Sequence, residues 1–136
     1  MSQKKILIVD DDPNYSDMLK AFLEEEGHLV WRVGDASALA ARVEKGDLPD
    51  LFIIDMQMPG GGGPAAVKNL RSSPATDKIP IVICSGMPVH QQEKWFRELP
   101  AVRFAQKPVE LLLIRDYVWE LLKVRPPEPP KPPKGD

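Results

Sequence analysis

Hydrophobic and polar positions along the chain alternate between short apolar runs and longer segments with helical spacing. Three runs contain no polar residue other than a cysteine, and such runs are typical of strands that are buried on both faces of a sheet. These runs are Ile6 to Val9, Leu51 to Ile54 and Ile81 to Cys84. Two further segments, Leu29 to Val33 and Val102 to Ala105, are predicted as strands with one arginine each.

The segments between these strands predict helices. The first helix has an N-cap, Asp12, a proline at its first position, Pro13, and a terminating glycine, Gly27, and each residue suits its place. The later helices are predicted from Asp35 to Gly46, Pro64 to Arg71, Val89 to Leu99 and Val109 to Val124.

Five strands that alternate with five helices predict a single α/β fold. Strands buried on both faces belong to a parallel sheet with helices on each side, and the crossover connections should be right-handed. The size of the body favours a doubly wound, flavodoxin-like sheet of five parallel strands in the order 2-1-3-4-5 over an eight-unit barrel.

Composition divides the chain into a body and a tail. The chain has 136 residues, and 15 of them are prolines, about twice the usual share of roughly 5%. Six of these prolines lie between residues 126 and 136. We therefore expect one domain over residues 1–125 and a Pro-rich tail or linker over residues 126–136, which would be semi-rigid in a polyproline II conformation.

Charge, cysteine content and hydropathy exclude several function classes. The net charge of −2 predicts no basic face for direct nucleic acid binding. A single cysteine, Cys84, excludes a disulfide within the chain. No run approaches the roughly 20 apolar residues that span a bilayer. We expect a cytoplasmic protein without a membrane anchor.

Polar side chains follow several of the predicted strands. Asp10, Asp11 and Asp12 follow the first strand, Asp55 the third, Ser85 the fourth and Lys107 the fifth. Ligands of an open parallel sheet bind beyond the carboxyl ends of its strands, so these side chains should meet at one edge. Clustered carboxylates without histidine or cysteine favour Mg²⁺ over zinc. A carboxylate beside Mg²⁺ can accept a phosphoryl group, whose charge the lysine would neutralise.

Four motifs carry a resemblance to a known family. ILIVDDDP (residues 6–13), IIDMQMP (53–59), ICSG (83–86) and QKP (106–108) resemble, in order and spacing, the receiver domain of bacterial two-component response regulators. The resemblance covers about residues 4–124. It implies a phosphorylation-activated switch that accepts a phosphoryl group from a sensor histidine kinase or a phosphotransfer protein, and that is not an enzyme beyond catalysing its own phosphorylation and dephosphorylation.

The resemblance also implies a role for each matching residue. Asp55 would be the phosphoacceptor. Asp10 and Asp11 would hold Mg²⁺ together with Asp55 and the backbone carbonyl of Gln57, with Asp11 the preferred direct ligand of the acidic pair. The phosphoryl-binding and switch residues would be Ser85, Lys107 and Phe104, and the bond before Pro108 would be cis. Asp12 is better interpreted as a helix cap.

Two alternatives to the receiver interpretation stay open. The pattern Asp10-x-Asp12 fits the start of a haloacid-dehalogenase-type phosphatase, although Pro13-Asn14 departs from that motif. A phosphorylation-independent interaction module is the other alternative, against which the intact set of Asp55, Ser85 and Lys107 argues. The glycine run 60–63 departs from the receiver pattern, and we expect a mobile loop there.

The last predicted helix offers a partner surface. Its core face contains Leu111, Ile114, Val118, Leu121 and Leu122. Leu112 and Trp119 lie nearly opposite on a helical wheel, so we expect an exposed apolar pair. A homodimer or an output partner would bind through this face.

Overall fold

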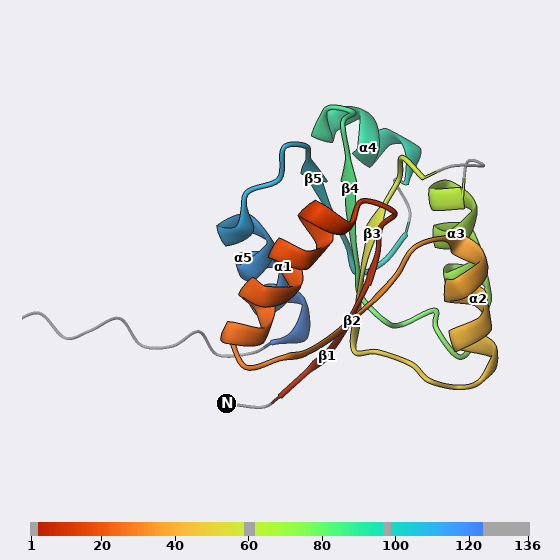
Figure 1. The fold of residues 1–136 in the computed structure, drawn as a ribbon. Coiled ribbons are helices and arrows are strands. Elements are labelled where there is room, and N and C mark those ends of the chain that lie inside the picture. The colour runs from red at the N-terminus through yellow and green to blue at the C-terminus, as the bar shows by residue number, and fades with distance from the viewer. Residues whose placement is uncertain (1–2, 59–61, 97–98, 124–136) are drawn as a thin grey trace, which may run out of the picture.

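The computed structural model describes residues 3–58, 62–96 and 99–123. Strands and helices alternate along the chain (Figure 1). The strands are β1 (Lys5–Val9), β2 (Leu29–Val33), β3 (Leu51–Asp55), β4 (Ile81–Ser85) and β5 (Val102–Gln106). The helices are α1 (Pro13–Glu25), α2 (Ala36–Glu44), α3 (Gly62–Ser72), α4 (Val89–Trp95) and α5 (Leu111–Leu122).

The strands form one sheet in the order β2-β1-β3-β4-β5, and all four described pairings are parallel. This confirms the predicted fold class. Every residue of β3 and β4 is buried, as their apolar sequences require, whereas the edge strands β2 and β5 carry exposed or half-buried positions. The last residues of the two buried strands, Asp55 of β3 and Ser85 of β4, therefore lie at the carboxyl edge of the sheet.

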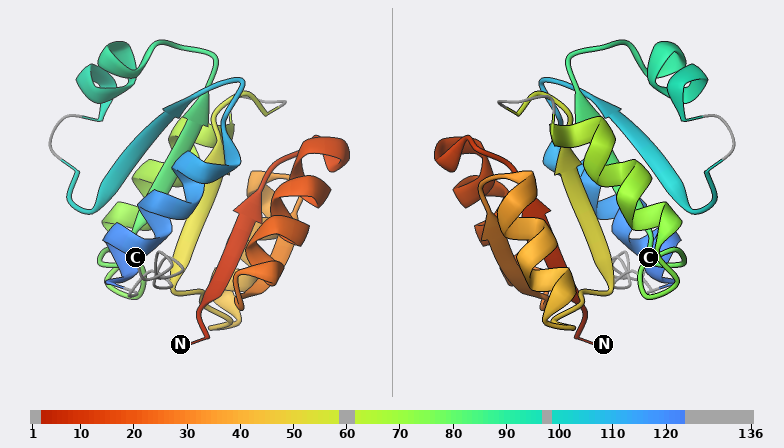
Figure 2. Two further views of the ribbon diagram at one scale, coloured as in Figure 1. Left: turned by 90° about the vertical axis from the view of Figure 1, so that its left-hand side faces the viewer. Right: turned by 90° about the vertical axis from the view of Figure 1, so that its right-hand side faces the viewer.

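Each face of the sheet builds its own hydrophobic core. On one face, Ile6 and Ile8 of β1 belong to the core that includes Leu19 of α1 and Ile114 of α5. On the other face, residues such as Leu7 pack with α2 and α3. Alternate residues of a strand point to opposite faces, so a fully apolar strand feeds both cores. Figures 1 and 2 show α1 and α5 on one side of the sheet and α2 and α3 on the other.

The predicted caps fix the starts of the first two helices. The Asp12 carboxylate accepts the Asn14 N–H at 3.0 Å, and the Asp35 carboxylate accepts the Ala38 N–H at 2.7 Å. Gly27 follows α1 with φ +97°, a backbone conformation that favours glycine. Asp12 therefore fixes the start of α1, and Gly27 lies in the short connection from α1 to β2.

Several predicted boundaries are wrong. The helix predicted to reach Leu99 ends at Trp95, because Phe96 leaves the helical conformation (φ −121°, ψ 32°) and is buried; Pro100 also disfavours a helical Leu99. The helix α3 begins at Gly62 rather than at Pro64. The first turn of a helix accommodates a proline, because the N–H groups of that turn have no partner within the helix. The predicted tail at 126–136, Val124 and Gly60 and Gly61 lie outside the described residues.

Candidate functional site

Three carboxylates meet at the carboxyl edge of the sheet. Asp10 follows β1 and Asp55 is the last residue of β3; both are buried, with 4% and 3% exposure. Asp11 is exposed. One oxygen of each of the three side chains lies within 4.8 Å of the others. A set of three carboxylate oxygens, one of them open to solvent, matches the ligand preference of Mg²⁺.

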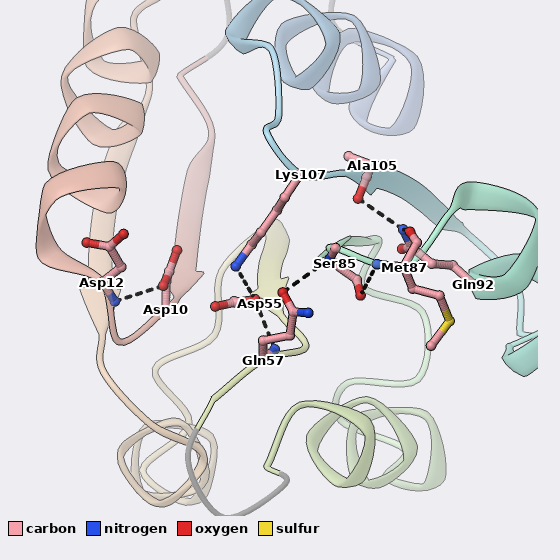
Figure 3. Close-up of polar contacts among 10 residues, drawn as sticks. Asp10, Asp12, Asp55, Gln57, Ser85, Met87, Gln92, Ala105 and Lys107 are labelled. Carbon is pink, nitrogen blue, oxygen red and sulfur yellow. Dashed lines mark hydrogen bonds and ion pairs between the residues drawn. The ribbon is translucent and has the colours of Figure 1, made fainter.

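Lys107 supplies the positive charge of the site. Its Nζ lies 2.7 Å from Oδ1 of Asp55, and the same oxygen accepts the backbone N–H of Gln57 at 3.0 Å. Figure 3 shows Lys107 reaching toward Asp55 from the loop after β5. The Lys107–Pro108 peptide bond is cis. The carboxyl ends of β3 and β5 bring a carboxylate and an ammonium group into direct contact.

The electrostatics of the cluster favour a cation. Burial and the charge of Asp55 raise the pKa of Asp10, against the lowering effect of the hydrogen bond from the Asp12 N–H. Burial by itself would lower the pKa of Lys107, but its hydrogen bond and ion pair with Asp55 outweigh this and raise it. Lys107 is therefore charged at neutral pH, and it is one ammonium group beside a cluster of three carboxyl groups.

The first acidic loop is fixed by backbone contacts. The Asp12 N–H donates to Oδ1 of Asp10 at 2.9 Å, and Arg32 of β2 donates to the Asp10 carbonyl at 2.9 Å. Asp12 itself caps α1 and is exposed, which confirms its interpretation as a helix cap. The Asp12 side chain points toward the helix start and away from Asp55 (Figure 3).

Ser85 ends β4 at the same edge and is buried. Its Oγ accepts the Met87 N–H at 3.1 Å, and among the described residues no hydrogen bond joins it to Asp55. Gln57 links the two neighbouring loops, because its Oε1 accepts the Gly86 N–H at 3.1 Å. The Ser85 hydroxyl is therefore held by its own loop, and Gln57 joins that loop to the loop after β3.

Phe104 lies on the edge strand β5 and is half-buried. Its ring stacks on Phe96 with 6.3 Å between centroids and 21° between planes. It lines a cavity of about 440 Å³ together with residues that include His90 and Leu99. The hydroxyl of Tyr117 in α5 donates to the Phe104 carbonyl at 2.8 Å. An aromatic ring beside a cavity of this size has space to change its position.

The expected exposed pair on the last helix is only half present. Leu112 is 55% exposed. Trp119 is half-buried, because the guanidinium group of Arg115 lies over its ring at 4.2 Å from the centroid. A helical wheel places Arg115 and Trp119 on the same face, because they are four residues apart, but it does not show whether the two side chains stack. Neither residue belongs to the carboxylate cluster.

Two residues of the site were missed by sequence reasoning. Gln92 is a buried polar residue that hydrogen-bonds into the Ser85 loop. Its spacing, three residues after Val89 and four before the buried Phe96, could have revealed it. Gly63 touches the backbone after the Asp55 strand: a Cβ there would lie 2.6 Å from the Met56 Cα. Gly63 therefore lies where there is no room for a larger side chain, and it is part of α3 rather than of the loop expected over residues 60–63.

Comparison with known proteins adds independent findings. The family model for the response regulator receiver domain matches residues 6–118. Protein PilH of Pseudomonas aeruginosa is 37% identical over 109 residues, which are 78% of this chain and 87% of PilH. In the described segments, no helix has the length and apolar character needed to cross a membrane.

Solved structures show the same architecture. A putative response regulator from Chloroflexus aurantiacus superposes with a TM-score of 0.81 at 28% identity, over 90% of this chain and 99% of that one. The signal receiver domain of a signal transduction histidine kinase from Syntrophus aciditrophicus gives a TM-score of 0.77 at 29% identity, over 96% and 98% of the two chains.

Proposed function

Because the chain belongs to the response regulator receiver domain family, we propose that Asp55 accepts a phosphoryl group and that this modification switches the conformation of the domain. The observation that carries the proposal is the buried Asp55 carboxylate, which lies between the acidic pair and the Lys107 ammonium group. The donor would be a sensor histidine kinase or a phosphotransfer protein of a two-component system.

The transfer follows from the contacts of Asp55. Both described contacts, from Lys107 and from the Gln57 N–H, fall on Oδ1, so we assign Oδ2 as the attacking oxygen. It forms a bond to phosphorus while the phosphorus–nitrogen bond of a phosphohistidine donor breaks, and the electron pair stays on the imidazole nitrogen. Lys107 then neutralises charge on the transferred phosphoryl oxygens. Hydrolysis reverses the modification when water attacks phosphorus and the Asp55 carboxylate leaves.

The donor set fits Mg²⁺ as the cofactor. Asp10, Asp11 and Asp55 would hold the ion, with the backbone carbonyl of Gln57 as a fourth protein ligand. When bound, Mg²⁺ would neutralise negative charge on the phosphoryl oxygens. The raised pKa of Asp10 supports this assignment, because burial and the charge of Asp55 both disfavour its ionised form and a bound cation would offset them.

Ser85 and Phe104 would transmit the switch. The Ser85 hydroxyl would turn from the Met87 N–H toward a phosphoryl oxygen, and the Phe104 ring would then move inward from its position against Phe96. Such a change shifts a two-state equilibrium only if the phosphoryl group interacts better with one state. The Ser85 hydroxyl is the group that would make this difference.

Labelling with a small phosphodonor tests the proposal. The protein is incubated with acetyl phosphate and Mg²⁺, and intact mass spectrometry should detect one phosphoryl group per chain. Asp55→Asn should take up none, whereas Asp17→Asn, on the exposed face of α1, should be labelled like the wild type. Label that persists in Asp55→Asn would place the acceptor elsewhere, and an unlabelled wild type would refute the proposal.

The phosphatase alternative is disfavoured by Asp12. Its carboxylate accepts the Asn14 N–H and caps α1, so the second aspartate of the Asp10-x-Asp12 pattern is engaged at the helix start. We therefore propose a switch that catalyses only its own phosphorylation and dephosphorylation. Turnover of small phosphate esters by the wild type would contradict this.

The α5 face is a proposed contact surface for a second copy or an output protein. Leu112 is exposed, and Arg115 over Trp119 forms a joined cationic and aromatic surface two turns along. If the wild type self-associates on phosphorylation, Leu112→Ala and Trp119→Ala should weaken that association in analytical ultracentrifugation. Met18→Ala, at an exposed position of α1, is the control and should have no effect.

The proposed function also concerns the location of the domain and the role of the residues that follow it. A domain over residues 1–125 would act in the cytoplasm, where histidine kinases present their phosphoryl groups. The Pro-rich residues 126–136 would act as a semi-rigid spacer.

A further inference from the structure

Gln92 is the most deeply buried polar side chain of α4, with 2% exposure. Its Nε2 donates to the Met87 carbonyl at 2.7 Å and to the Ala105 carbonyl at 3.2 Å. Its Oε1 is also buried and accepts no hydrogen bond from the described residues. Burial of an amide costs free energy unless the amide is hydrogen-bonded, so a buried Gln92 with one unpartnered oxygen needs an explanation.

The two carbonyls belong to the segments that contain the switch residues. Met87 follows Ser85 by two residues, and its N–H donates to the Ser85 Oγ. Ala105 lies on β5 directly after Phe104 and two residues before Lys107. Figure 3 shows the Gln92 amide between the Met87 loop and the β5 backbone. One side chain therefore ties the loop after β4 to the strand beside it.

We infer that Gln92 is a positioning residue that holds the loop 85–87 in the resting conformation, in which the Ser85 hydroxyl is kept on its own loop. This inference rests on the proposed function. Turning Ser85 toward a phosphoryl oxygen displaces the loop, and the Met87 carbonyl cannot move away from β5 while Gln92 bonds to both. The Nε2–Met87 bond therefore breaks during activation.

Loss of this bond should favour the active conformation. Gln92→Met keeps the length and the unbranched shape of the side chain but removes the donor, and it also removes the buried oxygen without a partner. If the resting conformation loses a stabilising contact, a larger fraction of the protein is in the active conformation. The apparent affinity for a phosphoryl mimic then rises in proportion. We expect beryllofluoride with Mg²⁺ to bind roughly two- to tenfold more tightly, the range that one net hydrogen bond supports.

The experiment measures beryllofluoride affinity through tryptophan fluorescence, since Trp95 lines a cavity of about 230 Å³ together with Ser85, Met87 and Gln92. Gln91→Met, at an exposed position of the same helix, is the matched control and should bind like the wild type. Initial rates of labelling by acetyl phosphate provide a second measurement and should rise in the same proportion.

The outcomes separate this inference from the proposed function. A wild type that binds no beryllofluoride and takes no label refutes the proposed function. A wild type that responds, with a folded Gln92→Met equal to it or weaker, refutes only the role of Gln92. Tighter binding by Gln92→Met supports that role, because damage to the fold lowers affinity and cannot raise it. If Gln92→Met does not fold by circular dichroism, Gln92→Leu is measured in its place, with the same two outcomes.

Discussion

Replacing Asp10 by asparagine should stabilise the metal-free protein at neutral pH. Asn keeps the shape of the side chain and an oxygen that can accept the Asp12 N–H. It removes a buried charge that lies beside Asp11 and Asp55. Most substitutions of buried polar residues destabilise a fold, so a gain in the free energy of unfolding would point specifically to charge repulsion.

The magnitude follows from the spacing of the carboxylates. Two unit charges 4.8 Å apart repel by roughly 3.5 kcal/mol at an effective dielectric constant of about 20. Lys107 contacts Asp55 and attracts Asp10, which offsets part of this repulsion. Exposure of Asp11 to solvent screens its share. We therefore expect Asp10→Asn to gain about 1 to 2 kcal/mol, or roughly 3 to 8 °C in melting temperature.

Thermal unfolding at two pH values and two Mg²⁺ concentrations measures this effect. Because folding raises the pKa of Asp10, its contribution to stability is present below its unfolded pKa and is lost as pH rises through its folded pKa. The gain of Asp10→Asn over wild type should therefore be larger at pH 7 than at about pH 4.5. Saturating Mg²⁺ should reverse the order, since a ligand at 100 times its Kd adds about 2.7 kcal/mol to the protein that binds it.

The control is Asp17→Asn, which removes one charge from an exposed position of α1 and should leave the melting temperature within error. If Asp10→Asn melts below the wild type without metal, or gains the same stability at both pH values, the carboxylates do not repel one another as argued. If Mg²⁺ stabilises Asp10→Asn and the wild type equally, Asp10 is not a ligand of the metal.

Two further predictions concern packing. Gly63→Ala should destabilise the fold by about 1 to 3 kcal/mol, because its Cβ would lie 2.6 Å from the Met56 Cα and 2.9 Å from the Asp55 carbonyl. Urea unfolding measures this, and Gly34→Ala, whose Cβ would meet only Arg32 at 3.7 Å, should be near neutral; equal effects would disprove the steric argument. Burial raises the pKa of the Cys84 thiol to about 12, so Ellman's reagent at pH 8 should fail to react with the native protein and should titrate one thiol per chain in guanidinium. Rapid reaction of the native protein would show that β4 opens.

The sequence predicted the fold because the sheet is buried on both faces. A segment such as Phe52 to Ile54 is buried on both faces and has no polar residue, so its hydrophobic run alone is enough to locate the strand. Helix starts followed from Asp12 and Asp35, whose capping needs only local contacts. The end of α4 did not follow, because the burial of Phe96 against Phe104 is a tertiary contact with the next strand, β5, and not a local signal of the helix.

The site divides in the same way. Asp10, Asp55 and Lys107 were predicted to meet because parallel strands end at one edge, and the structure brings them together. The interpretation of Gln92 needed three segments at once, since its two acceptors lie in the loop after β4 and in β5. The cation–π contact of Arg115 depends on the rotamers of both side chains, which a helical wheel does not represent.

The strand order also has a consequence for folding during synthesis. The strand β1 pairs with β2 and β3, so these three strands of the sheet can associate before β5 has left the ribosome. Asp10, Asp11 and Asp55 are then close together, while Lys107 is among the last residues of the fold to be made. We therefore expect early folding intermediates to carry an uncompensated cluster of negative charge, which magnesium ions in the cell would neutralise until the lysine arrives.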